Sequence, residues 1–465
     1  MRLLIIQPTA DARTLRFPYR HAVALLAAAL RKSPYEVSLL VTDGADEGAM
    51  AATVTDTSPL LMLMYVDSLA ADLAFHIADA LRSIRAVPLI LFGPHATRCP
   101  NDCLSMSGVE AVAVGPADGC IPAYLQARGQ GPEYLRTAGL WVNCETGVMR
   151  NPPAKAPPSL ADQPPPARDL YADVLDISGF AEVRVARGGE AGDASDEPAP
   201  PAELAAAWPG GAEWPLMLRP TASVIEEMTA VANDYFDMAG FRITNERWAS
   251  IPVWLAEFAP RYRQKIGLPL RTTLHAADVG DRAATLLKEA GGEEVRVRVG
   301  SGSTFIRNEI LSLGTSTEEL ENAFAALHRA KLASTAAIEI GAPYETSITL
   351  DETLSLLVRL DPDRVEAVLH WPAPGSHSHK VAKENGWLVA DAAAAHRAGK
   401  PSLALPSLSE EQLLAALECF PYQVVRPRVV PLIRWARRVR IGDRGTVYEL
   451  FVKPLLAPPV RRVKL

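Results

Sequence analysis

The stretch "PLLMLMYV", Pro59–Val66, is apolar at almost every position and is followed at once by polar residues. A continuous apolar run of this length is typical of a strand that is buried on both faces of a parallel sheet. It is far shorter than the roughly 18 residues that a membrane-spanning helix needs. The stretch therefore predicts a central strand of an α/β domain.

The segments on both sides of this strand alternate between strand-like and helix-like patterns. Strands are predicted at 2–8, 35–43, 88–93 and 109–115, and amphipathic helices at 21–33 and 69–84. Because strands that are joined through helices run parallel, residues 1–149 predict a doubly wound, Rossmann-like sheet with helices on both faces. Ligands of such sheets bind at the loops after the carboxyl ends of the strands.

A second domain is predicted beyond the proline-rich segment Arg150–Leu170, whose prolines exclude both helix and central strand. We expect residues 150–175 to form an extended linker. Six further strand–helix units follow, so residues 176–395 predict a partial or full barrel. The alternation ends near residue 396, and residues 396–465 predict a small, basic C-terminal region.

The composition limits the classes of function. The chain of 465 residues has a formal net charge of −7, which argues against a general nucleic-acid binder. From Pro421 onward it carries eleven Lys/Arg and two Asp/Glu, so this tail is either an ordinary solvated surface or a segment that docks on the acidic body of the chain or on an acidic partner. Five cysteines, a small and odd number, indicate a reducing compartment, and we expect a cytoplasmic protein without a membrane span.

Several segments, taken in order, resemble motifs of the cobalamin-binding radical S-adenosylmethionine (SAM) family. They are "LILFGPHATRCPNDCL" (Leu89–Leu104), "GVEAVAVGPAD" (Gly108–Asp118), "PPPARDLY" (Pro164–Tyr171), "RVGSGSTFIRNEI" (Arg298–Ile310) and "IEIGAPYETSITL" (Ile338–Leu350). The resemblance spans about Met1 to Gly386. It implies a Rossmann-like cobalamin-binding domain followed by a (β/α)6 partial TIM barrel, with cobalamin and SAM as cofactors.

The chain departs from this family at the motif that holds its iron–sulfur cluster. Family members carry C-x3-C-x2-C after the first barrel strand, whereas the stretch "RVARGGEAGDASDE" (Arg184–Glu197) has Gly189, Asp193 and Asp196 at these positions. A [4Fe–4S] cluster of this kind needs three thiolates, and carboxylate oxygens suit it poorly. We therefore expect no cluster and no radical formed from SAM. The near match "CPNDCLSM", from Cys99 onward, is interpreted as two loop cysteines at the start of a helix.

The resemblance and the predicted strand ends together indicate candidate residues for cobalamin. A corrin ring needs small residues for close approach and polar groups for its amide fringe. The candidates are Thr9, Tyr65, Ser68, Gly93, Pro94, His95 and Gly115. Tyr65 lies where family members place a residue beneath the cobalt, and His95 either contacts the corrin or satisfies a loop hydrogen bond. The motif D-x-H-x-x-G is absent from the sequence, so no axial histidine is expected.

Candidate contacts to SAM or a substrate lie at the predicted carboxyl ends of the barrel strands, where barrels of this type bind their ligands. They are Asn245, Glu246, His275, Ser301, Ser303 and Glu345. The histidines His370, His377 and His379 have no carboxylate at a recognisable ligand spacing, so they are interpreted as part of a polar loop. We expect no metal site, and the sequence assigns no residue a catalytic role.

Two functions agree with this pattern. In the first, the chain is a cobalamin- and SAM-dependent methyltransferase that works by polar transfer to a nucleophilic atom of a small-molecule substrate. In the second, it is a non-catalytic pseudoenzyme or cobalamin-binding regulatory subunit that pairs with an active radical SAM homologue. The motifs G-x-S-x-G, H-E-x-x-H and the P-loop are absent from the sequence, so hydrolase and nucleotide triphosphatase functions have no support.

Overall fold

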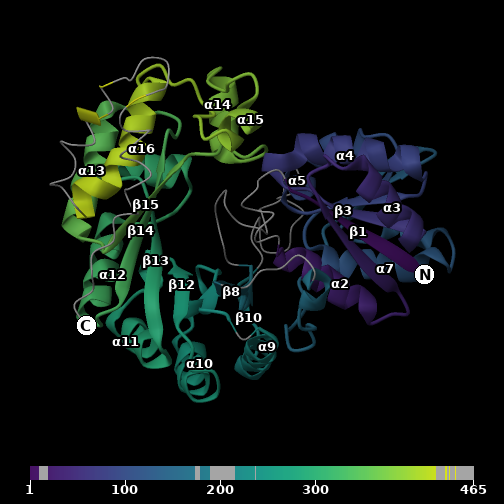
Figure 1. Cartoon of the computed structure of the whole chain (residues 1–465), viewed down its shortest axis with the longest axis horizontal. Coiled ribbons are helices and arrows are strands. Elements are labelled where there is room, and N and C mark those ends of the chain that lie inside the picture. The colour runs from purple at the N-terminus through teal and green to yellow at the C-terminus, as the bar shows by residue number, and fades with distance from the viewer. Residues whose placement is uncertain are drawn as a thin grey trace. The chain divides into compact units, whose positions relative to one another are not determined.

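The computed structural model describes residues 1–9, 19–172, 179–188, 215–235 and 237–425, together with Trp435, Ala436, Val439 and Thr446. The chain divides into two compact units, Met1–Ala239 with Ala373–Ser376 and Gly240–Pro372 with His377–Leu465. Figure 1 shows parallel strands with helices beside them in the purple-to-blue and in the teal-to-green parts of the chain.

The first unit contains a seven-stranded sheet in the order β2-β1-β3-β4-β5-β6-β7. The strands are β1 (Arg2–Pro8), β2 (Glu36–Thr42), β3 (Leu61–Tyr65), β4 (Leu89–Phe92), β5 (Val109–Ala113), β6 (Leu140–Cys144) and β7 (Gly147–Arg150). The pairs from β2 to β5 are parallel, and β6 and β7 continue the sheet as antiparallel strands. All residues of β3 are buried, so this strand lies inside the sheet as the sequence predicted.

Helices cover both faces of this sheet, because successive side chains of each strand point to opposite sides. Buried residues of β1 accordingly alternate between two separate hydrophobic cores. One core includes α2 (His21–Arg31) and α7 (Ala117–Arg128), and the other includes α3 (Glu47–Thr57) and α4 (Ala71–Ile84). Figure 1 shows α3 and α4 on one side of the strands and α2 and α7 on the other.

Shorter elements complete the first unit. They are η1 (Ser68–Ala70), α5 (Pro94–Arg98), α6 (Pro100–Leu104), η2 (Pro132–Arg136), η3 (Arg168–Tyr171), β8 (Phe180–Val183), β9 (Ala186–Arg187), β10 (Met217–Leu218) and α9 (Thr221–Asp234). The proline-rich residues 151–167 form neither helix nor strand.

A buried ion cluster fixes α9 within this unit. The carboxylate oxygens of Glu227 lie 3.0 Å from Arg168 Nη2 and 2.6 Å from Arg219 Nη1. The Arg168 guanidinium also lies over the ring of Tyr19, 4.3 Å from its centroid. Because buried charges are stable only when paired, the cluster holds η3 and the end of β10 against α9.

The second sheet has the strand order β15-β14-β13-β12-β11-β8. Its strands in the second unit are β11 (Gly240–Ile243), β12 (Leu270–Leu274), β13 (Gly292–Gly300), β14 (Ala333–Ile340) and β15 (Arg364–Leu369). Each of these pairs in parallel with the next. Parallel strands joined through helices confirm the α/β fold class that the sequence predicted.

Helices connect the strands of the second unit and follow the last of them. They are η4 (Trp248–Ser250), α10 (Pro252–Lys265), η5 (Ala276–Asp278), α11 (Asp281–Ala290), η6 (Ile306–Ile310), α12 (Thr317–Arg329), α13 (Ser347–Leu360), α14 (His377–Glu384), α15 (Ala392–Arg397) and α16 (Glu410–Val425). The last helix, α16, packs against β15 and α13. Within the described part of the chain, no helix has both the length and the apolar character needed to cross a membrane.

Candidate functional site

Thr9 lies where the strand order of the first sheet reverses. β1 has β2 on one side and β3 on the other, and open α/β sheets bind ligands at the carboxyl ends of strands at such a point. Thr9 follows β1 and is buried, and its amide donates to the carbonyl of Thr42 at 2.9 Å. Its hydroxyl has no hydrogen-bond partner among the described residues. A ligand with an amide fringe could supply that partner.

Glycines allow the chain to pass closely over the ends of β3 and β5. Gly93 has a φ of +111°, and an added Cβ would lie 2.9 Å from the Val66 carbonyl oxygen. Gly115 has a φ of +103°, and its amide donates to Thr97 Oγ1 at 3.0 Å. The Thr97 hydroxyl also donates to the carbonyl of Gly93 at 3.1 Å. Thr97 therefore links the two glycine loops, a role that the sequence alone did not indicate.

Tyr65 and Pro94 are buried beside these loops. The Tyr65 ring belongs to the hydrophobic core that includes α2 and α7, and it meets Phe92 edge-on with centroids 5.7 Å apart. Pro94 occupies the first turn of α5, where its missing amide hydrogen leaves no unpaired group. Both residues are immediate neighbours of Gly93: the Tyr65 ring lies 3.0 Å from where a Cβ of Gly93 would be, and Pro94 follows it in the chain.

His95 satisfies the loop hydrogen bond that was one of its two predicted roles. Its Nδ1 lies 3.3 Å from Ser68 Oγ, and both residues are buried. The ring also meets Phe75 edge-on, with centroids 6.0 Å apart. Burial lowers the pKa of His95, so its imidazole is neutral at pH 7.

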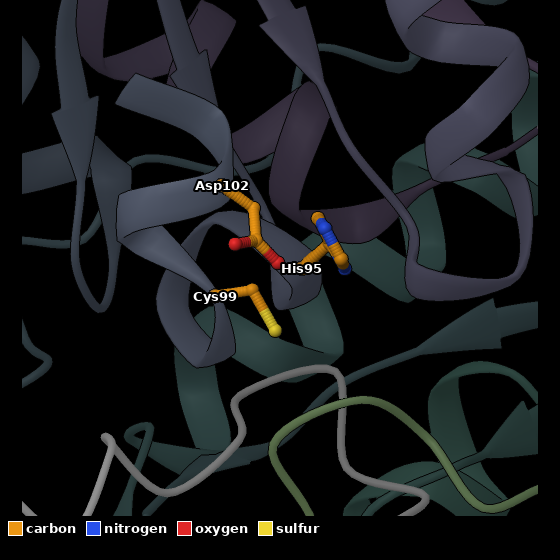
Figure 2. A group of neighbouring side chains, drawn as sticks. All are labelled: His95, Cys99 and Asp102. Carbon is orange, nitrogen blue, oxygen red and sulfur yellow. The ribbon is translucent and has the colours of Figure 1, made fainter. Parts of the chain in front are cut away.

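His95 also belongs to a group of side chains that the sequence interpretation overlooked. A ring nitrogen of His95, the thiol of Cys99 and a carboxylate oxygen of Asp102 all lie within 4.8 Å of one another. Figure 2 shows the three side chains converging from α5 and α6. Cys99 was interpreted as an ordinary loop cysteine, and its spacing of four and three positions from His95 and Asp102 is the sequence signal that could have indicated the group.

In the second unit, charged side chains form a chain at the carboxyl ends of the strands. Arg298 of β13 lies 3.6 Å from Glu246 and 3.4 Å from Glu339 of β14. Glu339 Oε2 in turn lies 2.7 Å from Nδ1 of His370, directly after β15. Burial alone would raise the pKa of Glu339, but the hydrogen bond to His370 and the charges of His370 and Arg298 hold it at about 2.

His370 is oriented by this contact. Its Nδ1 faces the Glu339 carboxylate, so Nε2 is the ring nitrogen that this contact leaves available. His370 is 2% exposed, and Nε2 has no hydrogen-bond partner among the described residues. The interpretation of His370 as part of a polar loop therefore missed a buried carboxylate–histidine pair.

Glu345 is a second buried acceptor near this pair. It is 1% exposed, and one oxygen accepts the amide of Gly341 while Oε1 has no partner in the described structure. Burial raises its pKa to about 7, even though the Gly341 amide and the charge of His370 act in the opposite direction. Near neutral pH this carboxyl group can therefore either donate or accept a proton.

His275 makes its contacts inside the barrel. Its Nε2 lies 3.0 Å from Thr315 Oγ1 and 3.1 Å from the Leu313 carbonyl oxygen. Its Nδ1 accepts the amide of Ala277 at 3.3 Å, which caps η5. Both ring nitrogens thus hold loops in place.

The other barrel candidates are also built into the protein interior. Ser301 Oγ accepts the amide of Ser303 at 3.2 Å and lies 3.3 Å from Thr353 Oγ1. Asn245, two residues after the end of β11, is 3% exposed. The guanidinium of the buried Arg307 donates to the Ser301 carbonyl at 2.8 Å, a support that the sequence did not indicate. These residues stay candidates for ligand contact.

The three residues that stand where the resembled family has its cluster cysteines belong to a part of the chain that the structure does not describe. Gly189, Asp193 and Asp196 lie outside the described residues. Whether these residues could hold an iron–sulfur cluster is therefore judged from their side chains, which supply two carboxylates and no thiolate.

The two sheets and the connections between their strands define the structural class of the protein. The chain has the fold of cobalamin-binding radical SAM enzymes, with a Rossmann-like domain and a partial barrel. No protein-family model and no curated protein matches the chain.

Solved structures provide the comparison. One is the radical S-adenosylmethionine methyltransferase TsrM from Kitasatospora setae with tryptophan substrate and a SAM analogue, with a TM-score of 0.64 and 18% identity over 82% of this chain and 76% of that one. TsrM with cobalamin and a [4Fe–4S] cluster gives a TM-score of 0.63 and 20% identity. The cobalamin-dependent SAM radical enzyme OxsB, with aqua-cobalamin and SAM bound, gives 0.68 and 11% over 95% of this chain and 69% of that one. At these identities the likeness shows the fold.

Proposed function

We propose that the chain is a cobalamin- and SAM-dependent methyltransferase that works by polar transfer and without an iron–sulfur cluster. The shared fold supports binding of the two cofactors that TsrM and OxsB bind. The cluster is the part that the donor set does not fit, because Gly189, Asp193 and Asp196 offer no thiolate. Without the cluster, SAM can act as a methyl donor only through its electrophilic sulfonium.

The strand ends of the first unit fit a corrin in their chemistry. The hydroxyl of Thr9, which has no partner in the described part of the chain, can bond an amide, and Gly93 and Gly115 place no side chain on the neighbouring loops. Thr9, Ser68, Gly93 and Gly115 are therefore the residues that we propose hold cobalamin. When bound, cobalamin supplies a cobalt centre able to accept and release a methyl group.

One observation carries the proposal of an enzyme rather than of an inert relative: the pair Glu339–His370. Polar methylation joins the methyl group to a nucleophile and expels the nucleophile's proton, so the site needs a base. Nε2 of His370 has no hydrogen-bond partner among the described residues, and Glu339 orients the ring and stabilises the imidazolium that forms when Nε2 takes a proton. We propose that His370 takes this proton and that Glu345 binds the same polar group of the substrate.

The test uses the full chain expressed with cobalamin and purified without iron. We expect corrin absorption without the broad iron–sulfur shoulder. We also expect transfer of the labelled methyl group of SAM to a member of a panel of nitrogen, sulfur and activated-carbon nucleophiles. The variant His370→Gln should lower this rate about 100-fold or more. His328→Gln, on the exposed surface of α12, is the matched control and should leave it unchanged.

Some outcomes would contradict this function. Turnover that appears only after cluster reconstitution would exclude the cluster-free route. Loss of activity in His370→Gln with an altered circular dichroism spectrum would mean a structural role, whereas rescue by added imidazole would support the base.

The second candidate is a non-catalytic partner of an active radical SAM homologue. The replaced cluster positions favour it, because a relative that has lost its reaction centre can keep a binding role. It predicts stable co-purification with a homologue that carries C-x3-C-x2-C, and no methyl transfer by the chain alone. A solitary and active chain would exclude it.

A further inference from the structure

The group His95, Cys99 and Asp102 combines three different metal-binding side chains at one place. The residues are spaced by four and three positions, which brings side chains to the same side of consecutive helical turns. Cys99 is the junction itself, because it ends α5 and precedes α6. The resulting nitrogen, sulfur and oxygen atoms lie within 4.8 Å of one another (Figure 2).

The histidine of this group is held in place from outside it. Ser68 contacts the ring at Nδ1, Phe75 packs against its edge, and His95 is 5% exposed. Such outer contacts orient histidine ligands in metal sites and strengthen metal binding. Asp102 is exposed and Cys99 is half-buried, so both can adjust toward an ion that His95 positions.

The geometry is close to that of a bound ion. Zinc binds nitrogen and oxygen at about 2.0–2.2 Å and sulfur at about 2.3 Å, so its ligand atoms stand about 3–4 Å apart. Movements of about 1 Å by the side chains of Cys99 and Asp102 would bring the group to that spacing. A mixed nitrogen, sulfur and oxygen set suits zinc and cobalt(II) better than the hard ions magnesium and calcium.

We propose that His95, Cys99 and Asp102 form a binding site for one zinc(II)-type ion. On binding, the Cys99 thiol loses its proton to solvent and becomes a metal-bound thiolate. Three protein ligands leave one position of a tetrahedral ion open to water or to a donor atom of a small molecule. The inference concerns residues of the first unit only and does not depend on the methyltransferase proposal.

The experiment titrates the full chain, stripped with a chelator and free of cobalamin, with cobalt(II) alone. We expect one equivalent to bind and to give a thiolate-to-cobalt absorption band that added zinc(II) removes. Cys99→Ser should abolish the band, and Asp102→Asn should weaken binding. Ser68→Ala should weaken it about 10-fold through the orientation of His95. Cys144→Ser, a half-buried cysteine elsewhere in the unit, is the matched control and should bind as the wild type does.

Two results would overturn the proposed metal site. One is the lack of a saturable thiolate band in the wild type, and the other is a band that persists in Cys99→Ser. Circular dichroism of each variant shows whether it is folded. Because Cys99 and Asp102 are not fully buried, their variants should keep the fold. A chain that binds cobalt(II) but no corrin would support this site and contradict the proposed function.

Discussion

Glu345 is a carboxyl group whose ionisation opposes folding. Burial raises its pKa from the ordinary value of 4.5 to about 7. The folded chain therefore holds this proton in a pH range where the unfolded chain has released it. The free energy of unfolding must fall as the pH rises from about 4.5 to about 7, because ionised Glu345 is poorly solvated in the interior.

Replacing Glu345 tests this directly. Glu345→Gln keeps an oxygen for the Gly341 amide and cannot ionise. In the wild type we expect Glu345 to lower the stability by up to about 3 kcal/mol between pH 4.5 and pH 7.5. This contribution should vanish in Glu345→Gln, as measured by urea unfolding at both pH values. Glu352→Gln, an exposed residue of α13, is the control and should follow the wild type. Equal pH dependence of all three proteins would contradict the prediction.

The elements of both sheets could be predicted from the sequence, but the register between neighbouring strands could not. Apolar runs and helical patterns mark β14 and β15 well. The pairing of Glu339 with Val368, however, depends on where the two strands settle against each other. That register places His370 beside Glu339. Sequence reasoning could therefore find Glu345 by resemblance and still miss the carboxylate–histidine pair.

Helix α9 provides a prediction about an element. Its Glu227 faces Arg168 and Arg219, and all three side chains are buried. Glu227→Gln would remove the charge of the carboxylate that both buried guanidinium groups contact, so we expect a loss of about 3–5 kcal/mol in unfolding free energy. Glu226→Gln, on the exposed face of the same helix, should change it by less than about 0.5 kcal/mol. Denaturant unfolding of the two variants gives the comparison, and equal stability would show that the cluster is not what holds α9.

For the molecule as a whole, the order of segments predicted the fold class, because the hydrophobic pattern of each strand and helix is visible in its own residues. The binding sites were harder to predict, because they combine residues that local patterns treat as unrelated. Thr97 joins two glycine loops only once β4 and β5 lie side by side. Cys99 approaches His95 and Asp102 through the local turn between α5 and α6, which the expectation of an ordinary loop cysteine did not consider. Resemblance indicated the region of the cobalamin candidates, and burial and hydrogen bonding distinguish their roles.

Binding and stability are linked in the whole chain through Thr9. The buried Thr9 hydroxyl has no partner among residues 1–9, 19–172 and the other described segments, and a buried hydroxyl left in this way lowers the stability of the ligand-free protein by about 1–3 kcal/mol. Thr9→Val has nearly the same shape and removes that unpaired group. The ligand-free variant should therefore be more stable than the wild type, whereas its affinity for cobalamin should fall if the hydroxyl bonds the corrin fringe.

Thermal unfolding with and without cobalamin separates these two effects. A ligand at 100 times its dissociation constant stabilises the folded chain by about 2.7 kcal/mol. We expect the wild type to show a stabilisation of this kind and Thr9→Val to show a smaller one from a higher starting stability. The control is Thr53→Val: the Thr53 hydroxyl donates to the Ala49 carbonyl within α3 at an exposed position, so this change should leave the cobalamin-dependent shift as in the wild type. A Thr9→Val chain that is less stable, yet stabilised fully by cobalamin, would mean that the hydroxyl serves the fold and not the cofactor.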